Sequence, residues 1–452
     1  MKNILLINAT TYDVQLPNEA QILRSNYSRA KSCIKKRKIP DINPMLICNT
    51  RSYSVGLLRI GTILKENGFA VQYRDFEDTD WETLEALLEN VDLIAFGAIT
   101  PTVPRCAQLC QRIKQVSPSI TVAIGGAHIN VAKSITQDRY PCFDIYADGY
   151  DVAAAAKLVG KPENSLTLPK EYVDYSLLPY PLSEYILNTF TTLGCTYRCD
   201  YCQDHRIPYY ENSDVTGLRH LIGKVPRGSR VHYFDSILGV KEVRTKQVCE
   251  ALSKIDHGFL LSCDARAEMI TPEIVQMMEG AGFTEISFGM ETADEAVLRA
   301  NKRTLSTERL SAAFDVIRNY SNMYISVYNA IGIPGSTIGA SEKSREVLID
   351  WLQNDRIDEI KTCIYVPYPM DGKNYRNRGV ILDTDDWSLF DRQSFPVYHL
   401  EHMTSQEIWD ESIKLMEASV NAWIKKLGFD TIDDLPNEYW IEYLTKHNYL
   451  IH

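Results

Sequence analysis

The first 160 residues alternate short apolar runs with longer segments in which apolar residues recur every three or four positions. Short apolar runs are typical of strands buried in a parallel sheet, and the longer period is typical of amphipathic helices. Strands that alternate with helices build a parallel sheet with helices on both faces. The sequence therefore predicts a doubly wound α/β domain over residues 1–160. The expected strands are 2–7, 70–74, 93–97, 121–124 and 144–147, and the expected helices are 54–67, 82–90 and 104–116.

The same alternation resumes in the middle of the chain. Residues 161–186 are rich in proline and carry no helix or strand pattern, so we expect an interdomain linker there. Residues 187–375 contain six strand candidates separated by helical stretches, which predicts a partial (β/α)6 barrel of the TIM type. The loops at the C-terminal ends of the strands would form its active face. The expected strands are 186–191, 230–234, 259–263, 285–289, 324–331 and 359–366.

Two other segments have weaker patterns. Residues 376–452 include an amphipathic helix at 404–427, and we expect them to form a mainly helical cap over the barrel mouth that shapes the substrate pocket. Residues 10–50, which are basic around Lys31–Lys38, form an insertion that is most simply a solvated loop. The apolar stripe of the helix, more typical of packing than of partner binding, comprises Ile408, Ile413, Met416, Val420, Trp423 and Leu427.

Composition and charge limit the classes of partner. The chain has 452 residues, 45% apolar and 24% charged, which is the composition of an ordinary soluble globular protein. Its net charge of −11 does not favour a nucleic-acid-binding face, so we expect a small-molecule or peptide substrate. The N-terminal apolar run is too short for a signal peptide, and no run approaches the roughly 20 apolar residues of a membrane span. These features predict a cytoplasmic protein.

Cysteine usage points to metal chemistry. Eleven cysteines in a chain expected to be intracellular favour metal or redox chemistry over a disulfide framework. Cys195, Cys199 and Cys202 lie close together, just after an apolar strand. Three thiolates can hold three irons of a 4Fe–4S cluster and leave the fourth iron open to a small molecule. A structural zinc site is the alternative, because His205 would complete a Cys3His ligand set.

This cysteine motif carries a family resemblance. The spacing CxxxCxxC, with the aromatic Tyr201 before the third cysteine, resembles the signature of radical S-adenosylmethionine (radical SAM) enzymes. The resemblance implies that SAM chelates the open iron through its amino and carboxylate groups. It also implies that one electron from the cluster, supplied by a reducing partner such as flavodoxin or ferredoxin, cleaves SAM to a 5′-deoxyadenosyl radical.

The ends of the barrel strands carry the residue types that SAM would need. SAM has an ammonium, a carboxylate and a ribose diol, so its site needs acidic, cationic and small residues. Glu291 could hold the ribose or the amino group, and Arg266 the carboxylate. The sequences around Glu291 and Gly332 look like barrel motifs of the cobalamin-associated radical SAM subgroup, although strand six reads PYPMDG where that subgroup often has Pro-Gly-Thr. The expected cofactor contacts in the barrel are Tyr201, Asp235, Arg266, Glu291 and Gly332; each could instead be a rim charge or a turn former.

The strand ends of the N-terminal domain are lined by small residues. Small residues let a bulky cofactor approach the backbone, and free amides at helix N-termini suit a phosphate. Residues 50–160 resemble the cobalamin-binding domain that precedes the barrel in the same subgroup, a fold also described as flavodoxin-like. The DxHxxG motif of cobalamin mutases is absent, as it is from many members of the subgroup, and a scaffold without cofactor is the alternative. The expected cobalamin contacts are Thr100, Thr102, Gly125, Gly126 and Gly149.

These resemblances imply a radical SAM enzyme with a 4Fe–4S cluster, SAM and cobalamin, which methylates an unactivated carbon of a natural product or other small molecule. A second hypothesis keeps the radical but not the methyl transfer, and gives dehydration, epimerisation, dehydrogenation or rearrangement of a small molecule, sugar or peptide. A third is a non-catalytic zinc-binding scaffold. Under the second hypothesis the candidate hydrogen donors are Tyr233, Tyr328, Tyr368, Cys263 and Cys363.

Overall fold

The N-terminal domain contains a five-stranded parallel sheet with strand order β2-β1-β3-β4-β5. The computed structural model describes residues 2–9, 52–76, 80–169, 172–212, 214–238, 241–302, 304–392, 394–426 and 428–430. The predicted doubly wound α/β fold is confirmed, and α5 and α6 are additional to the helices expected from the sequence. The strands are β1 (Asn3–Ala9), β2 (Ala70–Asp75), β3 (Leu93–Ala98), β4 (Thr121–Gly125) and β5 (Ile145–Ala147), and the helices are α2 (Val55–Glu66), α3 (Trp81–Leu87), α4 (Val103–Val116), α5 (Ile129–Arg139) and α6 (Asp151–Val159).

The second domain is the predicted partial barrel. Its six strands pair in parallel and in chain order, which is the topology of an incomplete (β/α) barrel. The first strand is shorter than expected because the chain soon turns into an antiparallel hairpin. The strands are β6 (Asn188–Thr189), β9 (Arg230–Tyr233), β10 (Leu260–Ala265), β11 (Phe283–Gly289), β12 (Tyr324–Ile331) and β13 (Glu359–Ile364), and the helices are α7 (Glu242–Leu252), α8 (Pro272–Gly280), α9 (Glu295–Asn301), α10 (Thr307–Tyr320) and α11 (Ile338–Gln353).

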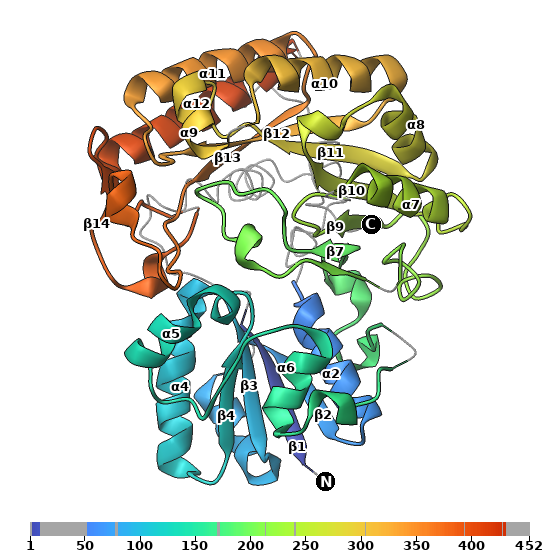
Figure 1. Cartoon of the computed structure of the whole chain (residues 1–452), viewed down its shortest axis with the longest axis vertical. Coiled ribbons are helices and arrows are strands. Elements are labelled where there is room, and N and C mark those ends of the chain that lie inside the picture. The colour runs from blue at the N-terminus through green and yellow to red at the C-terminus, as the bar shows by residue number, and fades with distance from the viewer. Residues whose placement is uncertain are drawn as a thin grey trace.

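The segment after the barrel differs from the expected helical cap. It begins with a small antiparallel pair, β14 (Val380–Leu382) and β15 (Tyr398–Leu400), and continues into α12 (Ser405–Lys426). Helix α12 packs beside α11 and β13, in the outer layer of the barrel rather than over its mouth (Figure 1). The apolar stripe buries Ile408 and Met416. The insertion at 10–50, residues 431–452 and the side chains of Val420, Trp423 and Leu427 lie outside the described residues.

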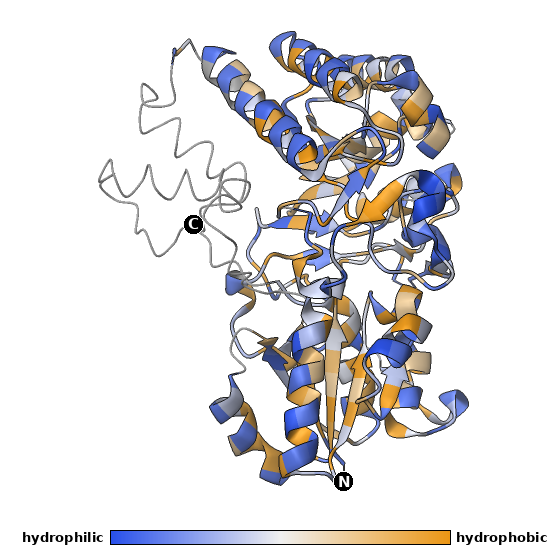
Figure 2. Cartoon of the chain, turned by 90° about the vertical axis from the view of Figure 1, so that its left-hand side faces the viewer, coloured by the Kyte–Doolittle hydropathy of each residue, from blue (hydrophilic) through white to orange (hydrophobic). Residues whose placement is uncertain are grey.

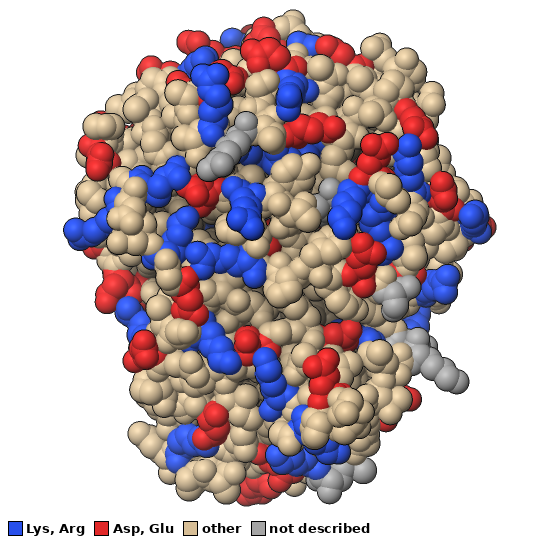
Figure 3. All heavy atoms as spheres, in the orientation of Figure 1, with Lys and Arg blue, Asp and Glu red and all other residues tan. Residues whose placement is uncertain are grey.

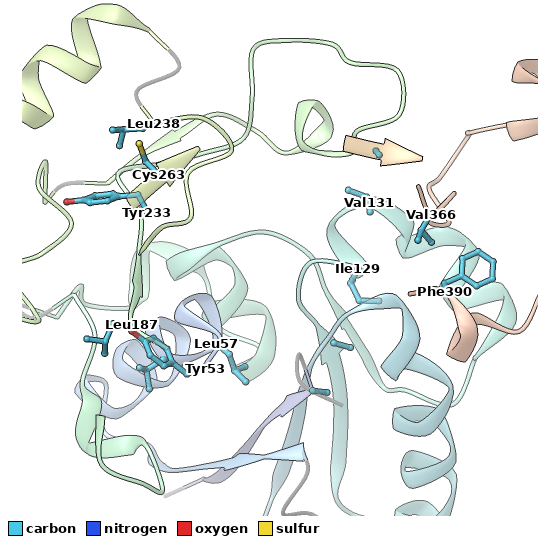
Figure 4. Packing of buried hydrophobic residues seen from close by; sticks show 14 of the residues in the cluster. Tyr53, Leu57, Ile129, Val131, Leu187, Tyr233, Leu238, Cys263, Val366 and Phe390 are labelled. Carbon is cyan, nitrogen blue, oxygen red and sulfur yellow. The ribbon is translucent and has the colours of Figure 1, made fainter. Parts of the chain in front are cut away.

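The two domains share one continuous apolar core. Figure 1 shows the N-terminal sheet below the barrel, with the loop that follows β7 between them. In both domains apolar strands are covered by helices whose outer faces are hydrophilic (Figure 2). Ile129 and Val131 of α5 lie near Val366 and Phe390 from the barrel side of the molecule (Figure 4). The relative position of the domains is therefore fixed by packing.

The linker is part of this packing. It forms one-turn 3₁₀ helices at Glu163–Ser165, Tyr175–Leu177 and Leu182–Glu184. The ring of Tyr53 makes edge contacts with Tyr175 at 5.7 Å and Tyr185 at 5.6 Å between centroids. The Tyr53 hydroxyl also bonds to the backbone carbonyl and amide of Asn188, at 3.1 and 3.2 Å. Tyr53 thus joins the N-terminal domain directly to the first barrel strand.

A residue of the barrel caps a helix of the other domain. Helix α5 has a non-helical residue, Ala132, which leaves the amides of its second half without partners in the preceding turn. The carboxylate of Asp371, which follows strand β13, accepts hydrogen bonds from the amides of Ser134 at 2.9 Å and Ile135 at 3.0 Å. Its own amide donates to the Val131 carbonyl at 2.8 Å.

The surface has mixed charge. Lys and Arg are interspersed with Asp and Glu over the face seen in Figure 3. None of the helices in the described part of the chain is long and apolar enough to cross a bilayer.

The interdomain cap gives a stability prediction. Asp371→Ala should lower the free energy of unfolding by about 1 kcal/mol, the usual value of a capping carboxylate, and should speed amide hydrogen exchange at residues 132–139. Asp80→Ala is the matched control, because Asp80 caps α3 within the N-terminal domain through the amide of Thr83. Unchanged exchange in α5 of Asp371→Ala would contradict the assigned cap.

Candidate active site between the two parallel sheets

The three predicted ligand cysteines lie in a closed hairpin loop. Strand β7 (Thr192–Leu193) pairs antiparallel with β8 (Tyr210–Glu211), and residues 194–209 connect them. Gly194 has a φ of +75°, and a Cβ there would lie 2.5 Å from the carbonyl oxygen of Ile207, so the neck of the loop requires glycine. The Cys195 amide donates to the Asp204 carbonyl at 3.2 Å. The loop thus holds its cysteines at the C-terminal face of the barrel.

Asp235 anchors this hairpin to the barrel. Its carboxylate is buried at the end of β9 and accepts four hydrogen bonds of 2.6–2.7 Å, from the amides and hydroxyls of Thr191 and Thr192. Desolvation raises the pKa of Asp235 to about 6, against the opposing effect of these donors. Both oxygens are occupied, so we assign Asp235 a positioning role in place of the predicted cofactor contact.

Two of the three cysteine sulfurs accept hydrogen bonds, which favour the thiolate form. The Cys199 sulfur accepts a hydrogen bond from the Arg266 guanidinium at 3.7 Å, and the Cys202 sulfur from the Asp204 amide at 3.4 Å. Burial raises the pKa of Cys195 and Cys202, and metal binding would reverse this effect. These features fit a cluster that takes three thiolates on three different irons.

The zinc alternative requires ligands that meet at one point. Among the described residues, no group of three or more His, Cys, Asp or Glu side chains is arranged to hold a single metal ion. His205 is only partly buried, and its Nδ1 has no hydrogen-bond partner. A cubane does not need its thiolates to converge on one metal, so this criterion does not apply to it.

Arg266 is brought to the cysteine loop as predicted, but it is already well bonded. Its guanidinium pairs with Glu268 at 2.6 Å and bonds to the Thr304 hydroxyl at 2.8 Å. It also stacks over the ring of Tyr197, 3.9 Å from the centroid. The cation is therefore fixed beside Cys199. Its contact with the SAM carboxylate stays a prediction.

Tyr201 and Glu291, both predicted SAM contacts, meet in the structure. The Tyr201 hydroxyl donates to Glu291 at 3.1 Å, and the Lys302 ammonium lies 3.4 Å from the same oxygen. Glu291 has a φ of +68°, a strained conformation for a residue with a side chain. The Lys302 ammonium also bonds to the Gly289 carbonyl at 2.7 Å, which places it at the site although it was not among the expected cofactor contacts.

Gly332, which follows β12, is packed by the segment after the barrel. Its φ is +79°, and a Cβ there would meet the Tyr398 hydroxyl and Ile408 at 3.0 Å or less. The Tyr398 hydroxyl donates to the Gly332 carbonyl at 2.8 Å. These contacts explain the glycine by packing against β15 and α12, and none of them involves the cysteine loop.

The two threonines predicted to contact cobalamin have internal partners. The Thr100 hydroxyl bonds to His128 Nδ1 at 2.9 Å, and the Thr102 hydroxyl donates to the Ala9 carbonyl at 2.7 Å. Desolvation lowers the pKa of His128 to about 4, so this imidazole is neutral at pH 7. Trp387 packs on it with centroids 5.0 Å apart. The hydroxyls of Thr100 and Thr102 are thus bonded to other residues of the N-terminal domain.

The three predicted glycines leave the carboxyl ends of β4 and β5 without side chains. Gly126 has a φ of +98°, and a Cβ there would lie 2.7 Å from the amide nitrogen and carbonyl oxygen of Ala98. Gly125 packs its backbone against Ala147, while the Gly149 amide donates to Asn130 at 2.8 Å. Next to Gly149, the Tyr150 hydroxyl is buried close to the Asn130 side chain. Bare backbone at these strand ends fits a bulky ligand such as cobalamin.

The two sites face each other. Asp151, at the start of α6, pairs with Arg59 at 2.6 Å and accepts a hydrogen bond from Tyr210 of the cysteine hairpin at 3.0 Å. Arg206, in the cysteine loop, donates to the Asp371 carbonyl at 2.6 Å. The cysteine loop is therefore bonded to both domains, and the carboxyl edge of the N-terminal sheet lies next to it.

Sequence comparisons identify both domains. Residues 49–159 match the B12 binding domain family, and residues 189–348 match the Radical SAM superfamily. The chain is 27% identical over 217 residues to the hopanoid C-2 methylase of Rhodopseudomonas palustris (strain TIE-1), which covers 42% of this chain and 40% of that protein. It is 19% identical over 322 residues to the anaerobic magnesium-protoporphyrin IX monomethyl ester cyclase of Rubrivivax gelatinosus, covering 62% and 57%. The chain thus spans about half the length of these relatives.

A solved structure has the same fold. The radical S-adenosylmethionine methyltransferase TsrM from Kitasatospora setae, with cobalamin and a [4Fe–4S] cluster bound, matches with a TM-score of 0.60 at 12% identity. The match covers 93% of this chain and 89% of that one. It confirms the arrangement of an N-terminal parallel-sheet domain followed by a barrel.

The cysteine loop gives a mutational prediction. Cys199→Ala should lose most of the bound iron and all cleavage of SAM, because only three protein sulfurs are available and Cys199 is the one beside Arg266. Its circular dichroism should match the parent chain, because Cys199 lies in a loop. Cys142→Ala, a half-buried cysteine of the N-terminal domain, is the control. Formation of 5′-deoxyadenosine by Cys199→Ala at the parent rate would refute the ligand assignment.

The glycines at the carboxyl edge of the N-terminal sheet give a second mutational prediction. Gly126→Ala should destabilise the chain by about 2 kcal/mol or more, because a Cβ at positive φ is strained and would press on the Ala98 backbone. The carboxyl edge should deform, so we expect cobalt uptake to fall while iron content is unchanged. Gly56→Ala is the control, because nothing lies within 4 Å of its Cβ position. Full cobalt uptake by Gly126→Ala would exclude this edge as the cobalamin site.

Proposed function

Because this chain belongs to the radical SAM superfamily, in the subgroup with an N-terminal cobalamin-binding domain, we propose that it is a cobalamin-dependent methyltransferase that acts on an unactivated carbon of a small molecule. The juxtaposition of the cysteine loop and the carboxyl edge of the N-terminal sheet is the observation that supports this function. A radical source and a methyl source placed there could reach the same substrate atom. Methylation is also the activity named for the hopanoid relative.

The protein would hold three cofactors at this junction. Cys195, Cys199 and Cys202 would bind the 4Fe–4S cluster, and the edge around Gly125 and Gly149 would bind cobalamin. When bound, the cofactors would supply hydrogen abstraction by the 5′-deoxyadenosyl radical and a methyl group in place of that hydrogen, with SAM as the source of both and a flavodoxin- or ferredoxin-like partner as the reductant.

The chain's own side chains would then orient and shield these groups. Arg266 would stabilise negative charge on the cluster sulfurs, since it is held beside Cys199 by Glu268. Glu291 would accept a hydrogen bond from SAM, and Lys302 and Tyr201 keep this carboxylate in place. The apolar contacts between the domains would exclude water, which protects a reactive radical from side reactions.

Radical chemistry without methyl transfer is the second candidate, because the cyclase relative has a different named reaction. It would need a hydrogen donor near the substrate. Tyr233 and Cys263 are fully buried, and the Tyr233 hydroxyl bonds to the Thr216 carbonyl on the side away from the barrel interior. Tyr328, Tyr368 and Cys363 are only partly buried, so they are the remaining candidates.

Metal content separates the candidates. After anaerobic reconstitution with iron, sulfide and hydroxocobalamin, we expect about four irons and about one cobalt per chain. With methyl-labelled SAM and a low-potential reductant, a methyltransferase should pass the label to a product. Four irons without cobalt would favour the second candidate, and zinc in place of iron would refute both.

A further inference from the structure

The barrel interior has a filled lower part. Inward-facing side chains of β11, β12 and β13 form a hydrogen-bonded group there, with one ammonium between two carboxylates. The Lys361 ammonium lies 3.0 Å from Glu285 and 3.7 Å from Glu359, and it bonds to the Ser287 hydroxyl at 3.3 Å. The Ser326 hydroxyl bonds to both glutamates. These groups satisfy one another, so they leave little for a ligand.

The upper part, toward the cysteine loop, holds an exposed aromatic ring. Phe234 follows β9 at the C-terminal face and keeps 61% of its surface exposed, although β9 is an interior strand of the sheet. It packs against His232, with centroids 5.5 Å apart, and His232 bonds to the Ser262 hydroxyl at 3.0 Å. An exposed aromatic ring on an interior strand indicates room for an apolar ligand group.

An unpaired cation stands at this level. The Arg392 carbonyl accepts the Ile364 amide at 3.0 Å, so Arg392 continues the sheet beyond the end of β13. Its side chain is exposed, and its guanidinium has neither a hydrogen bond nor an ion pair with any residue of the described part of the chain. The five N–H donors of its guanidinium are therefore free of partners within the described part of the chain.

An unpaired carboxylate lies within electrostatic reach of Arg392. Asp264 ends β10, and its side chain has no hydrogen bond; its Oδ1 is buried and unsatisfied. Burial raises the pKa of Asp264, and the charges of His232, Lys361 and Arg392 oppose that rise. Asp264 and Arg392 are therefore close enough to interact electrostatically, although no hydrogen bond or ion pair joins them. Buried polar groups are normally satisfied, so the orphaned Asp264 carboxylate beside an exposed guanidinium indicates a missing ligand.

We propose that this upper chamber, formed by Phe234, Asp264 and Arg392, binds the substrate. Arg392 holds an anionic group, a carboxylate or a phosphate; Asp264 accepts a hydrogen bond from an N–H or O–H of the same molecule; and Phe234 packs on its apolar part. The proposal rests on the proposed function and narrows the substrate to a small organic acid or phosphate ester with an apolar face. Tyr328 and Tyr368, which interact electrostatically with Arg392, lie beside it.

The test uses small probes on the full chain, anaerobically reconstituted with its cofactors. The probes are phenylacetate, phenyl phosphate, the neutral phenylacetamide, and L-phenylalanine, which adds an ammonium. Dissociation constants would be measured by ligand-observed NMR up to 20 mM. The variants are Arg392→Gln, Arg392→Lys and Asp264→Asn, and Arg227→Gln is the control because Arg227 is a surface residue paired with Asp256.

The expected results separate the three contacts. At least one of the two anions should bind at least tenfold more tightly than phenylacetamide, and which one does so distinguishes a carboxylate site from a phosphate site. Arg392→Gln should remove this preference, Arg392→Lys should restore part of it, and Arg227→Gln should keep it. L-phenylalanine should bind more tightly than phenylacetate, and Asp264→Asn should abolish that gain.

Other outcomes would overturn the proposal: equal affinity for the acid and the amide, an anion affinity that Arg392→Gln does not change, or no saturable binding of either anion. The same preparation would be assayed for 5′-deoxyadenosine. If no 5′-deoxyadenosine forms but the preference for anions is intact, the proposed function is refuted and the chamber remains an anion-binding site. If 5′-deoxyadenosine forms but the preference for anions is missing, only the proposed substrate site is refuted.

Discussion

The structure depends on keeping the cysteine hairpin between two parallel sheets whose carboxyl ends point at each other. The hairpin has few contacts of its own: its two strands pair over only two residues each. A buried carboxylate, Asp235, compensates by binding the amides and hydroxyls of Thr191 and Thr192 together. Removing such a group would leave four donors unsatisfied in the interior, which is costly. The loop is thus held by polar contacts that the barrel supplies.

The same constraint governs the domain interface. Tyr210 of β8 donates a hydrogen bond to Asp151, at the start of α6. Arg206 of the cysteine loop donates to the carbonyl of Asp371, whose carboxylate caps the second half of α5. The hairpin is therefore bonded to residues that lie at two helices of the N-terminal domain. Asp371 in turn completes the broken helix α5. An isolated N-terminal domain would lose this cap. We infer that the second half of α5, the carboxyl edge it borders and the cysteine loop are stabilised as one unit.

The sequence was sufficient for the fold because alternating strands and helices leave few topologies, and periodic apolar runs mark both kinds of element. It missed α5 and α6 for local reasons. Helix α5 is interrupted at Ala132 and depends on Asp371, more than 230 positions away. Helix α6 is alanine-rich and has only 9 residues. For the site, the sequence predicted that Tyr201, Arg266 and Glu291 lie near the cysteines, as they do in the structure. The sequence could not show that Asp235 is hydrogen-bonded to Thr191 and Thr192. Nor could it show that Gly332 packs against Tyr398, because these partners come from other segments of the chain.

Chemical type alone therefore does not identify ligand-binding residues at strand ends. Asp235 and Asp264 are both aspartates at the carboxyl ends of neighbouring barrel strands, and either could have been the cofactor contact. The first has four donors on its two oxygens, whereas the second has none. Buried polar atoms in folded proteins are nearly always bonded, so the unpaired one marks where a ligand supplies the partner. By the same reasoning Asp264, rather than the better-bonded Asp235, marks the ligand side of the barrel.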